Sequence, residues 1–319
     1  MKLRRLGNSP IELSPLGLGC WQFSKSKGFA GSFWPNLSDE ETFSIVKHSL
    51  DLGVNWFDTA ELYGWGKSEM SLSLALKKTN NNNIFIATKW WPLFRTAKSI
   101  KSTISDRLSS LNGFPITLHQ IHMPFGFSSI EKEMEAMAEL VYDKKIRYVG
   151  VSNFNKQQMI RAYKALSRMG VELVSNQVEY SILNRKIESN GILHTAKDLG
   201  ISIIAYSPLT QGLATGKFHD DPNLIKKNHI WRSFKLKNKN LSLSNSFPVI
   251  RELKKIARKY DASVSQIALS WLMNFNGDVV FVIPGARTVE QAKDNAQAMS
   301  ILLSSSELKL LNDVSKSFR

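Results

Sequence analysis

Four polar side chains end or closely follow short apolar runs of this chain, and their types fit proton-transfer chemistry. They are Asp58, Tyr63, Lys89 and His122. A phenol has an ordinary pKa of about 10, and lowering it to about 7 takes roughly 4 kcal/mol of stabilisation. An ammonium group about 4 Å away supplies about that much at an effective dielectric constant near 20. We therefore expect Lys89 to lower the pKa of Tyr63, Asp58 to hold Lys89 charged, and His122 to orient a carbonyl group or share the proton.

Each of these residues also has a simpler interpretation. A strand often ends in a polar residue, Asp58 and Lys89 could form a purely structural ion pair, and an isolated His122 could be a satisfied core residue. His119 lies three residues before His122, so in a strand their side chains point to opposite faces and cannot bind one metal ion together. Because Cys20 is the only cysteine, we expect neither a zinc site nor an intrachain disulfide.

The hydrophobic pattern indicates how the chain brings these side chains together. Short β-branched or aromatic runs alternate with amphipathic helical stretches, which is typical of βα units in a parallel sheet. The predicted strands are 16–20, 56–59, 84–89, 118–122, 148–152, 173–177, 202–206 and 279–283. The predicted helices between them include 40–52, 68–78, 97–111, 130–142, 156–168 and 192–199, with Asp39 and Asn155 as expected N-caps. Eight such units predict an α/β fold, a closed (β/α)8 TIM barrel, in which functional groups lie at the C-terminal ends of the strands.

An open doubly wound sheet is the alternative fold. Its usual glycine-rich turn is incomplete here, because Gly17-x-Gly19 has no third glycine at the required offset. Residues 3–6 and 11–13 flank a turn and predict a β-hairpin that could plug the bottom of the barrel. A long connection, 211–247, precedes two further helices, 247–260 and 264–274. We expect residues 1–319 to form a single barrel domain.

Composition restricts the class of protein. The 319 residues carry 42 basic and 27 acidic side chains, a formal net charge of +15. No apolar run is long enough for a membrane span, and no secretion signal follows the basic start, so we expect a cytoplasmic protein without a membrane partner. The basic residues are spread along the chain, so no nucleic-acid partner is expected. They are densest over 226–239, which is interpreted as a solvated loop, with attraction of anions as the alternative.

Seven motifs, in order along the chain, resemble those of the aldo-keto reductases. They are Asp58-Thr59-Ala60-Glu61-Leu62-Tyr63-Gly64, Thr88-Lys89, Gln120-Ile121-His122-Met123-Pro124, Gly150-Val151-Ser152-Asn153-Phe154, Asn176-Gln177-Val178-Glu179-Tyr180, Tyr206-Ser207-Pro208-Leu209-Thr210-Gln211-Gly212-Leu213 and Ile283-Pro284-Gly285-Ala286-Arg287. The segment 208–217 looks most like the branch that includes bacterial reductases and potassium-channel β-subunits. The resemblance implies hydride transfer between NADPH/NADP+ and a small-molecule aldehyde or ketone, with Tyr63 as general acid and Asp58, Lys89 and His122 completing the catalytic set.

The resemblance also implies which residues hold the cofactor and the substrate. Cofactor-binding residues carried over are Trp21, Ser152, Asn153, Gln177, Tyr206, Ser207, Pro208, Leu209, Gly212, Pro284, Gly285, Arg287, Gln291 and Asn295. For Gln291 an alternative stands, because Thr288-x-x-Gln291 is also a capping box for the last helix of the barrel. Substrate-binding residues expected are Trp21, Tyr63, Trp90 and His122, with Trp90 chosen because it adjoins Lys89.

Two departures from the family pattern and several alternatives stay open. Thr117 and His119 replace an acidic residue and a tyrosine, and Asp294 replaces a glutamate beside the expected adenine site. An aromatic lining favours apolar carbonyl compounds, whereas the net positive charge favours anionic ones such as sugar phosphates. The alternative functions are a cofactor-sensing binding subunit of the channel-β kind and a cofactor-free barrel lyase or isomerase that uses Lys89 and Asp58. The oligomeric state is left open.

Overall fold

The computed structural model describes residues 2–28, 33–79, 81, 83–226 and 242–319. Its strands are β1 (Arg4–Arg5), β2 (Glu12–Leu13), β3 (Leu18–Gly19), β4 (Trp56–Asp58), β5 (Phe85–Trp90), β6 (Ile116–Ile121), β7 (Ile146–Ser152), β8 (Leu173–Glu179), β9 (Ser202–Tyr206) and β10 (Val280–Val282). Strands β3 to β10 form one parallel sheet in which each strand pairs with the next along the chain. Parallel bridges Leu16–Val282 and Gly19–Gly285 join the first strand region to the last, so the sheet closes. The predicted (β/α)8 barrel is confirmed.

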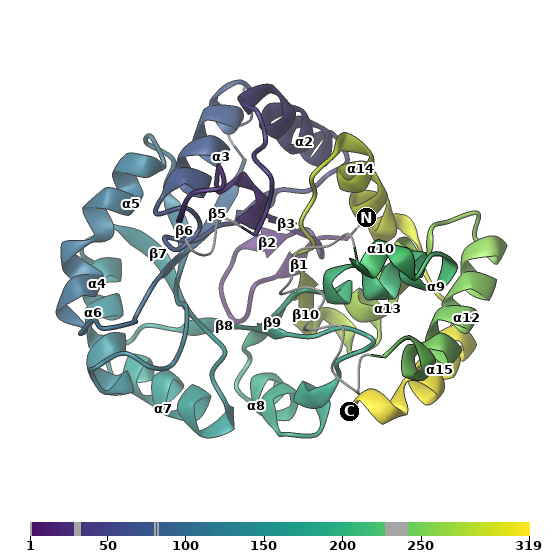
Figure 1. The fold of residues 1–319 in the computed structure, drawn as a ribbon. Helices are drawn as coiled ribbons and strands as arrows, with labels where there is room; N and C mark the ends of the chain where they lie inside the picture. The colour runs from purple at the N-terminus through teal and green to yellow at the C-terminus, as the bar shows by residue number, and fades with distance from the viewer. Residues whose placement is uncertain (1, 29–32, 80, 82, 227–241) are drawn as a thin grey trace.

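Helices form an outer ring around these strands (Figure 1). They are α2 (Asp39–Asp51), α3 (Lys67–Lys77), α4 (Lys98–Ser102), α5 (Ile104–Ser110), α6 (Ile130–Tyr142), α7 (Lys156–Ser167), α8 (Ile192–Asp198), α9 (Lys217–Asp220), α10 (Asn223–Lys226), α12 (Leu243–Lys259), α13 (Val264–Asn274), α14 (Val289–Gln297) and α15 (Ser305–Val314). All the predicted helices are present within a few residues, and the two extra helices predicted after residue 247 are α12 and α13.

Three local predictions need correction. The N-cap of α2 is Ser38 and not Asp39, because the Ser38 side chain accepts from the Glu41 N–H and Glu41 returns a hydrogen bond in a full capping box. The predicted helix 97–111 is interrupted at Thr103, which separates α4 from α5. Helix α12 begins before Phe247, at Leu243, because the Ser242 side chain caps it by accepting from the Asn245 N–H. The segment 227–241, which holds most of the basic 226–239 stretch, lies outside the described residues.

The N-terminal hairpin lies against the interior of the barrel. Strands β1 and β2 pair antiparallel, and Leu6, Ile11 and Leu13 are buried in one cluster with interior residues of the barrel strands, among them Trp56 and Phe281. In the view of Figure 1 the hairpin lies across the middle of the helical ring. The hairpin therefore plugs one end of the barrel and contributes apolar surface to its inner core, as predicted.

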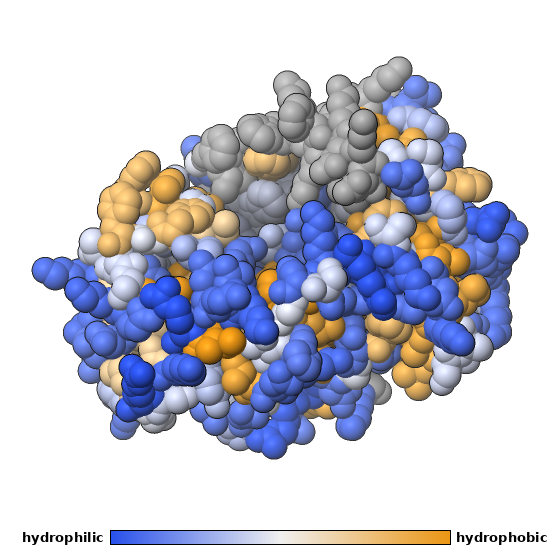
Figure 2. Space-filling view, turned by 90° about the horizontal axis from the view of Figure 1, so that it is seen from below, coloured by the Kyte–Doolittle hydropathy of each residue, from blue (hydrophilic) through white to orange (hydrophobic). Residues whose placement is uncertain are grey.

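The outer surface is largely hydrophilic on the face seen in Figure 2, with apolar residues gathered in small groups between hydrophilic ones. Within the described ranges, no helix is both long and apolar enough to cross a bilayer. The larger apolar cluster lies between the sheet and the helices and draws on α2 to α8, α12 and α13. The barrel strands are therefore held between two apolar cores, one inside the barrel and one between the sheet and the helices.

Helix α6 contains a buried carboxyl group that should weaken the fold as pH rises. Glu133 is 2% exposed, and its Oε1 has no hydrogen-bond partner among the described residues. Burial raises the pKa of Glu133 from 4.5 to about 7. The folded chain therefore holds this proton more tightly than the unfolded chain, so the contribution of Glu133 to stability is greatest below pH 4.5 and falls as pH rises to about 7.

Replacing Glu133 by Met should remove this pH dependence. We expect the unfolding free energy of Glu133→Met, relative to the wild type, to increase by about 2 to 3 kcal/mol between about pH 5 and pH 8. Chemical denaturation at both pH values measures it. Glu131→Met is the matched control on the same helix, because its exposed carboxylate pairs with Arg161, which holds the pKa of Glu131 down to about 2. Glu131 stays ionised in both states over this range, so an equal change in both variants would refute the explanation.

Candidate active site

The four residues predicted to do chemistry lie together at the C-terminal ends of neighbouring strands. Asp58 ends β4, Lys89 lies one residue before the end of β5, and His122 directly follows β6. Tyr63 lies in the turn after β4, where its N–H donates to the Ala60 carbonyl oxygen at 3.1 Å. Because these strands are parallel neighbours, their carboxyl ends meet at one rim of the barrel.

Lys89 is the centre of this group. Its side chain is fully buried, and Nζ donates to Asp58 Oδ1 at 2.5 Å and to the Thr59 carbonyl oxygen at 2.8 Å. Nζ also lies 5.1 Å from the centre of the Tyr63 ring, close enough for the two side chains to influence each other's pKa. The second oxygen of Asp58 accepts from Gln177 Nε2 at 2.8 Å and from Gln120 Nε2 at 3.3 Å. Asp58 is thus held on both sides, and it holds the ammonium group against the phenol.

The pKa of Tyr63 beside Lys89 is shifted in the direction opposite to the expectation. Burial raises the pKa of Tyr63, and this effect outweighs the opposing influence of Lys89, so the net shift is upward. Burial also opposes the charged form of Lys89, but Asp58 and Tyr63 together raise the pKa of Lys89 above its ordinary value. The expected fall of the Tyr63 pKa towards neutrality is therefore wrong for the chain alone, because a buried phenolate is poorly solvated. At neutral pH the site holds a protonated phenol beside an ammonium group.

His122 faces Tyr63 and is uncharged at neutral pH. Its ring lies edge-on to the Tyr63 ring, with 5.8 Å between centres. Burial, and secondarily the charge of Lys89, holds the pKa of His122 well below its ordinary value. A neutral imidazole donates one hydrogen bond and accepts one, so His122 can donate to an oxygen placed beside Tyr63. His119 is also buried, on the outer side of β6, and burial followed by the charge of Arg107 lowers its pKa to about 3.

Aromatic rings surround the Tyr63–His122 pair. The ring of Trp21 in η1 (Trp21–Phe23) stacks on Tyr63 with 6.0 Å between centres. Trp91 packs edge-on against His122 at 5.3 Å, and Phe125 packs edge-on against Trp91 at 5.6 Å. The mouth of the site is therefore apolar on the side of Trp91 and Phe125.

Trp90 does not belong to this group of aromatic rings. It is 1% exposed, belongs to the core between sheet and helices, and donates from Nε1 to Ser99 Oγ on α4 at 3.0 Å. Successive side chains of a strand point to opposite faces, so the inward direction of Lys89 turns Trp90 outward. The sequence prediction of Trp90 as a pocket residue is corrected to Trp91, which follows the end of the strand.

The residues expected to hold the nicotinamide end of a cofactor lie beside this group. Tyr206 at the end of β9 donates to Asn153 Oδ1 at 3.0 Å, and Asn153 Nδ2 donates to the His122 carbonyl oxygen at 3.2 Å. Ser152 Oγ donates to the Gln177 carbonyl oxygen at 2.9 Å. Gln177 is buried and its amide is already bonded to Asp58, so its observed contacts link it to the catalytic group.

The residues expected to hold the phosphates line the ends of β9 and β10. The backbone has positive φ at Ser207, Thr210, Gln211 and Gly212. At Gly212 φ is 98°, and a Cβ would lie 3.0 Å from Lys217 Cε, so a side chain is disfavoured there. Pro208 is buried and Leu209 half-buried at the start of this turn.

Near the start of α14, two buried polar atoms lack a hydrogen-bond partner within the described residues. Arg287 Nε and Gln22 Oε1 are buried with no hydrogen-bond partner in the described part of the chain. Gln22 lies so close to Gly285 that a Cβ there would be 2.2 Å from Gln22 Nε2. Pro284 and Asn295 are buried, and Asn295 Nδ2 donates to the Gly285 carbonyl oxygen at 3.3 Å. A guanidinium nitrogen that the described residues leave without a partner, two residues after Gly285, fits an anionic dinucleotide.

Helix α14 begins differently from the predicted capping box. The Thr288 side chain accepts from the Gln291 N–H at 3.2 Å, as a cap should. Gln291 Oε1, however, accepts from the Arg287 N–H at 2.8 Å and not from the N–H of the cap residue. Gln291 therefore fixes the backbone of Arg287, and a full capping box is absent. Asp294 accepts from Ser263 Oγ at 2.9 Å on the neighbouring helix α13.

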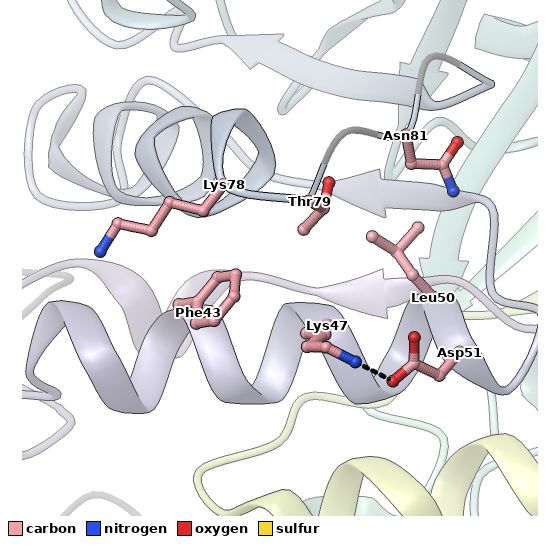
Figure 3. Close-up of a pocket in the computed structure, with 7 residues that line it drawn as sticks. All are labelled: Phe43, Lys47, Leu50, Asp51, Lys78, Thr79 and Asn81. Atoms are coloured by element: carbon pink, nitrogen blue, oxygen red, sulfur yellow. Dashed lines mark hydrogen bonds and ion pairs between the residues drawn. The ribbon is translucent and has the colours of Figure 1, made fainter.

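A shallow pocket on the helical layer contains none of these residues. It lies between α2 and the end of α3 and is lined by Phe43, Lys47, Leu50, Asp51, Lys78, Thr79 and Asn81 (Figure 3). Lys47 and Asp51 pair with each other at its edge, at 2.7 Å. The pocket is therefore separate from the strand ends that carry the candidate site.

Comparison with known proteins identifies the family. The family model described as the aldo/keto reductase family matches residues 15–316. The chain belongs to the aldo/keto reductase family. It is thus an oxidoreductase of the class that uses a nicotinamide cofactor on small-molecule carbonyl compounds. The rim that holds Asp58, Tyr63, Lys89 and His122 is the C-terminal face, where barrel enzymes carry their active sites.

Individual known proteins resemble this chain over nearly its whole length. An uncharacterized oxidoreductase of Mycobacterium tuberculosis is 34% identical over 314 residues, covering 97% of this chain and 91% of the relative. The NADH-specific methylglyoxal reductase of Escherichia coli is 27% identical, covering 99% of each chain. The solved structure of a glycerol dehydrogenase from Gluconobacter oxydans has a TM-score of 0.84 and 28% identity, covering 98% of this chain and 94% of that chain.

Proposed function

We propose that this aldo-keto reductase reduces an aldehyde or ketone to an alcohol with NADPH, and that Tyr63 donates the proton. The observation that carries the proposal is the fully buried Lys89, which pairs with Asp58 and lies 5.1 Å from the centre of the Tyr63 ring. When bound, the reduced cofactor supplies a hydride to the carbonyl carbon. The phenol donates its proton to the carbonyl oxygen. The C=O double bond thereby becomes a C–O single bond, with one new C–H bond and one new O–H bond.

The neighbouring residues assist this transfer. As the proton leaves, negative charge develops on the Tyr63 oxygen, and the adjacent ammonium group of Lys89 stabilises it. Neutral His122 donates a hydrogen bond to the substrate oxygen and places it within reach of the phenol. The aromatic rings at the mouth exclude water, which strengthens both effects. In this proposal the cofactor lies against Trp21, Ser152, Asn153, Tyr206 and the turn 207–212, and reaches the segment 284–295.

The choice of NADPH over NADH rests on Arg287. Its buried Nε has no partner among the described residues, which supports binding of an anionic group in addition to the pyrophosphate, such as a 2′-phosphate. One relative is NADH-specific by name, so cofactor choice varies among the proteins this chain resembles. A cytoplasmic location is also part of the proposal. So is a single domain over residues 1–319, which is supported because the site is assembled from strands β4 to β10.

The two alternative functions are less well supported. A cofactor-sensing binding subunit would use the same residues. The only feature that favours it is the likeness of residues 208–217 to the branch that includes potassium-channel β-subunits. A cofactor-free lyase or isomerase would need a neutral Lys89 to attack a carbonyl group, whereas Asp58 and Tyr63 raise the Lys89 pKa and favour its charged form. Titrating the purified protein with NADPH, followed by turnover with a panel of carbonyl compounds, separates the three functions. Binding without turnover would favour the binding subunit, and turnover without a cofactor would favour the lyase or isomerase.

The aromatic rings of Trp91 and Phe125 support apolar or ring-bearing carbonyl compounds as substrates. We expect Trp91→Ala to raise KM for an aromatic aldehyde about 2- to 10-fold, which corresponds to one lost aromatic contact of about 0.5 to 1.5 kcal/mol. Trp90→Ala is the matched control on the outer face of β5, and it should destabilise the fold by about 3 to 5 kcal/mol while KM of the folded enzyme changes little. Steady-state kinetics and chemical denaturation measure both. A larger change of KM in Trp90→Ala than in Trp91→Ala would contradict the placement of Trp91 at the site and of Trp90 in the outer core.

A further inference from the structure

Glu61 is a buried acidic residue inside the turn that connects Asp58 to Tyr63. It is 5% exposed, and the reaction proposed above gives it no role. Its backbone N–H donates to the Lys89 carbonyl oxygen at 3.2 Å, and its own carbonyl oxygen accepts from the Gly66 N–H at 3.0 Å. The main chain of Glu61 is therefore tied both to the strand that carries Lys89 and to the far side of the Tyr63 turn.

The carboxylate of Glu61 makes a second set of ties to the segment after Lys89. Oε2 accepts from the backbone N–H of Trp91 at 3.0 Å. Oε1 accepts from Arg95 Nη1 at 2.6 Å and lies 3.4 Å from Arg107 Nη1. Hydrogen bonds between charged groups are shorter and stronger than neutral ones, and burial strengthens them further. The Glu61 side chain thus anchors the main chain at Trp91, just after the Lys89 carbonyl group that its own N–H binds.

These contacts join the two rings that flank His122. Tyr63 packs edge-on against His122 from the turn after β4, and Trp91 packs edge-on against it from the segment after β5. We propose that Glu61 is a positioning residue that sets the spacing between Tyr63 and Trp91, and so holds the phenol and the imidazole in register for proton donation. The inference rests on the proposed function, because it assigns Glu61 a task in that reaction.

A purely structural role for Glu61 makes a different prediction. Glu69, on α3, lies 3.0 Å from Arg107 Nε and accepts from Thr88 Oγ1 at 2.5 Å, so Arg107 keeps an acidic partner when Glu61 is changed. The hydrogen bond to Trp91 has no such substitute in the described contacts of that N–H. A structural role would therefore reduce stability alone, whereas a positioning role also changes the rate of the chemical step.

The test is Glu61→Gln, compared with Glu188→Gln. Glu188 in η2 (Lys186–Glu188) is a matched control, because it is a similarly buried carboxylate paired with a buried arginine, Arg185, and it is not part of the site. Trp91 and Arg95 donate to different oxygens of Glu61, and glutamine replaces one of these oxygens by an NH₂ group, so in the same side-chain position one of the two contacts is lost. Four quantities are measured for each protein: NADPH affinity, kcat for a carbonyl substrate, the deuterium isotope effect on kcat, and hydrogen exchange of the peptide that contains Trp91.

We expect Glu61→Gln to lower kcat about 10- to 100-fold, as a displacement of about 1 Å can do, and to change NADPH affinity less than about twofold. The isotope effect should rise because the chemical step becomes slower, and the Trp91 amide should exchange faster. Glu188→Gln should change none of these four quantities. Where Glu61→Gln fails to fold, Glu61→Asp keeps the charge but shortens the reach, and the same readouts apply.

Two outcomes separate failure of this inference from failure of the proposed function. A wild-type kcat, or unchanged exchange at Trp91, in folded Glu61→Gln overturns the positioning role while the wild-type enzyme still reduces carbonyl compounds. A wild-type protein that reduces no carbonyl compound overturns the proposed function. In that case faster exchange at Trp91 would still report the anchoring contact, without the catalytic task assigned to it.

Discussion

Replacing Tyr63 by Phe should reduce kcat by at least about 10²- to 10⁴-fold, the range typical of general acid catalysis. The variant loses only the hydroxyl group, so the ring can still stack with Trp21 and pack edge-on against His122. NADPH should bind with nearly unchanged affinity, because the Tyr63 hydroxyl group is not among the expected cofactor contacts and the ring that packs on Trp21 is kept. Pre-steady-state kinetics with saturating NADPH measure the chemical step directly.

The buried lysine makes this prediction specific to the hydroxyl group. Both hydrogen-bond acceptors of Lys89, Asp58 and the Thr59 carbonyl oxygen, remain in the variant to bind the ammonium group. The fold should therefore tolerate the substitution, which thermal unfolding of the variant checks. Near-normal turnover by a folded, cofactor-binding Tyr63→Phe protein would remove Tyr63 from the role of acid.

Replacing Arg287 by Ala should weaken NADPH binding about 30- to several-thousand-fold, since losing one member of a buried charge pair costs about 2 to 5 kcal/mol. NADH lacks the 2′-phosphate, so its dissociation constant should change little. The reason is the position of Arg287 just before α14, where its backbone is fixed by Gln291 and its Nε lacks a described partner. Helix N-terminal N–H groups at this point add to the attraction for phosphate.

Dissociation constants of both cofactors, measured by fluorescence titration, test this cofactor preference. Arg161→Ala is a suitable control, because it removes one positive charge from an exposed ion pair with Glu131. The control should leave the ratio of NADPH to NADH affinity unchanged. Equal losses for both cofactors in Arg287→Ala, or no loss for either, would show that Arg287 does not bind the 2′-phosphate.

The sequence predicted the barrel and the grouping of Asp58, Lys89 and His122 for the same physical reason. Short apolar runs separated by helices form parallel strands, and the carboxyl ends of parallel strands meet at one rim. A polar residue at the end of such a run is therefore placed by the pattern alone. Tyr63 follows from the same logic, because it lies in the turn directly after β4.

Other features depend on information that lies outside the local pattern. Trp90 was chosen because it adjoins Lys89, although the alternation of side chains along a strand already indicated that it points away. The pKa direction of Tyr63 depends on how much water the surrounding rings exclude, and no sequence spacing reports that. The contacts of Gln120 and Gln177 with Asp58 join three strands across the barrel interior, so they require the closed sheet.

Transfer of a label tests the central claim most directly. NADPH that carries deuterium at its transferable position is incubated with the protein and a reducible aromatic aldehyde, and the alcohol is analysed by mass spectrometry and NMR. The account predicts an alcohol with one deuterium on the former carbonyl carbon, formed by the wild type and strongly suppressed in Tyr63→Phe. An alcohol without deuterium at that carbon, or no alcohol with any carbonyl compound of the panel, would contradict it.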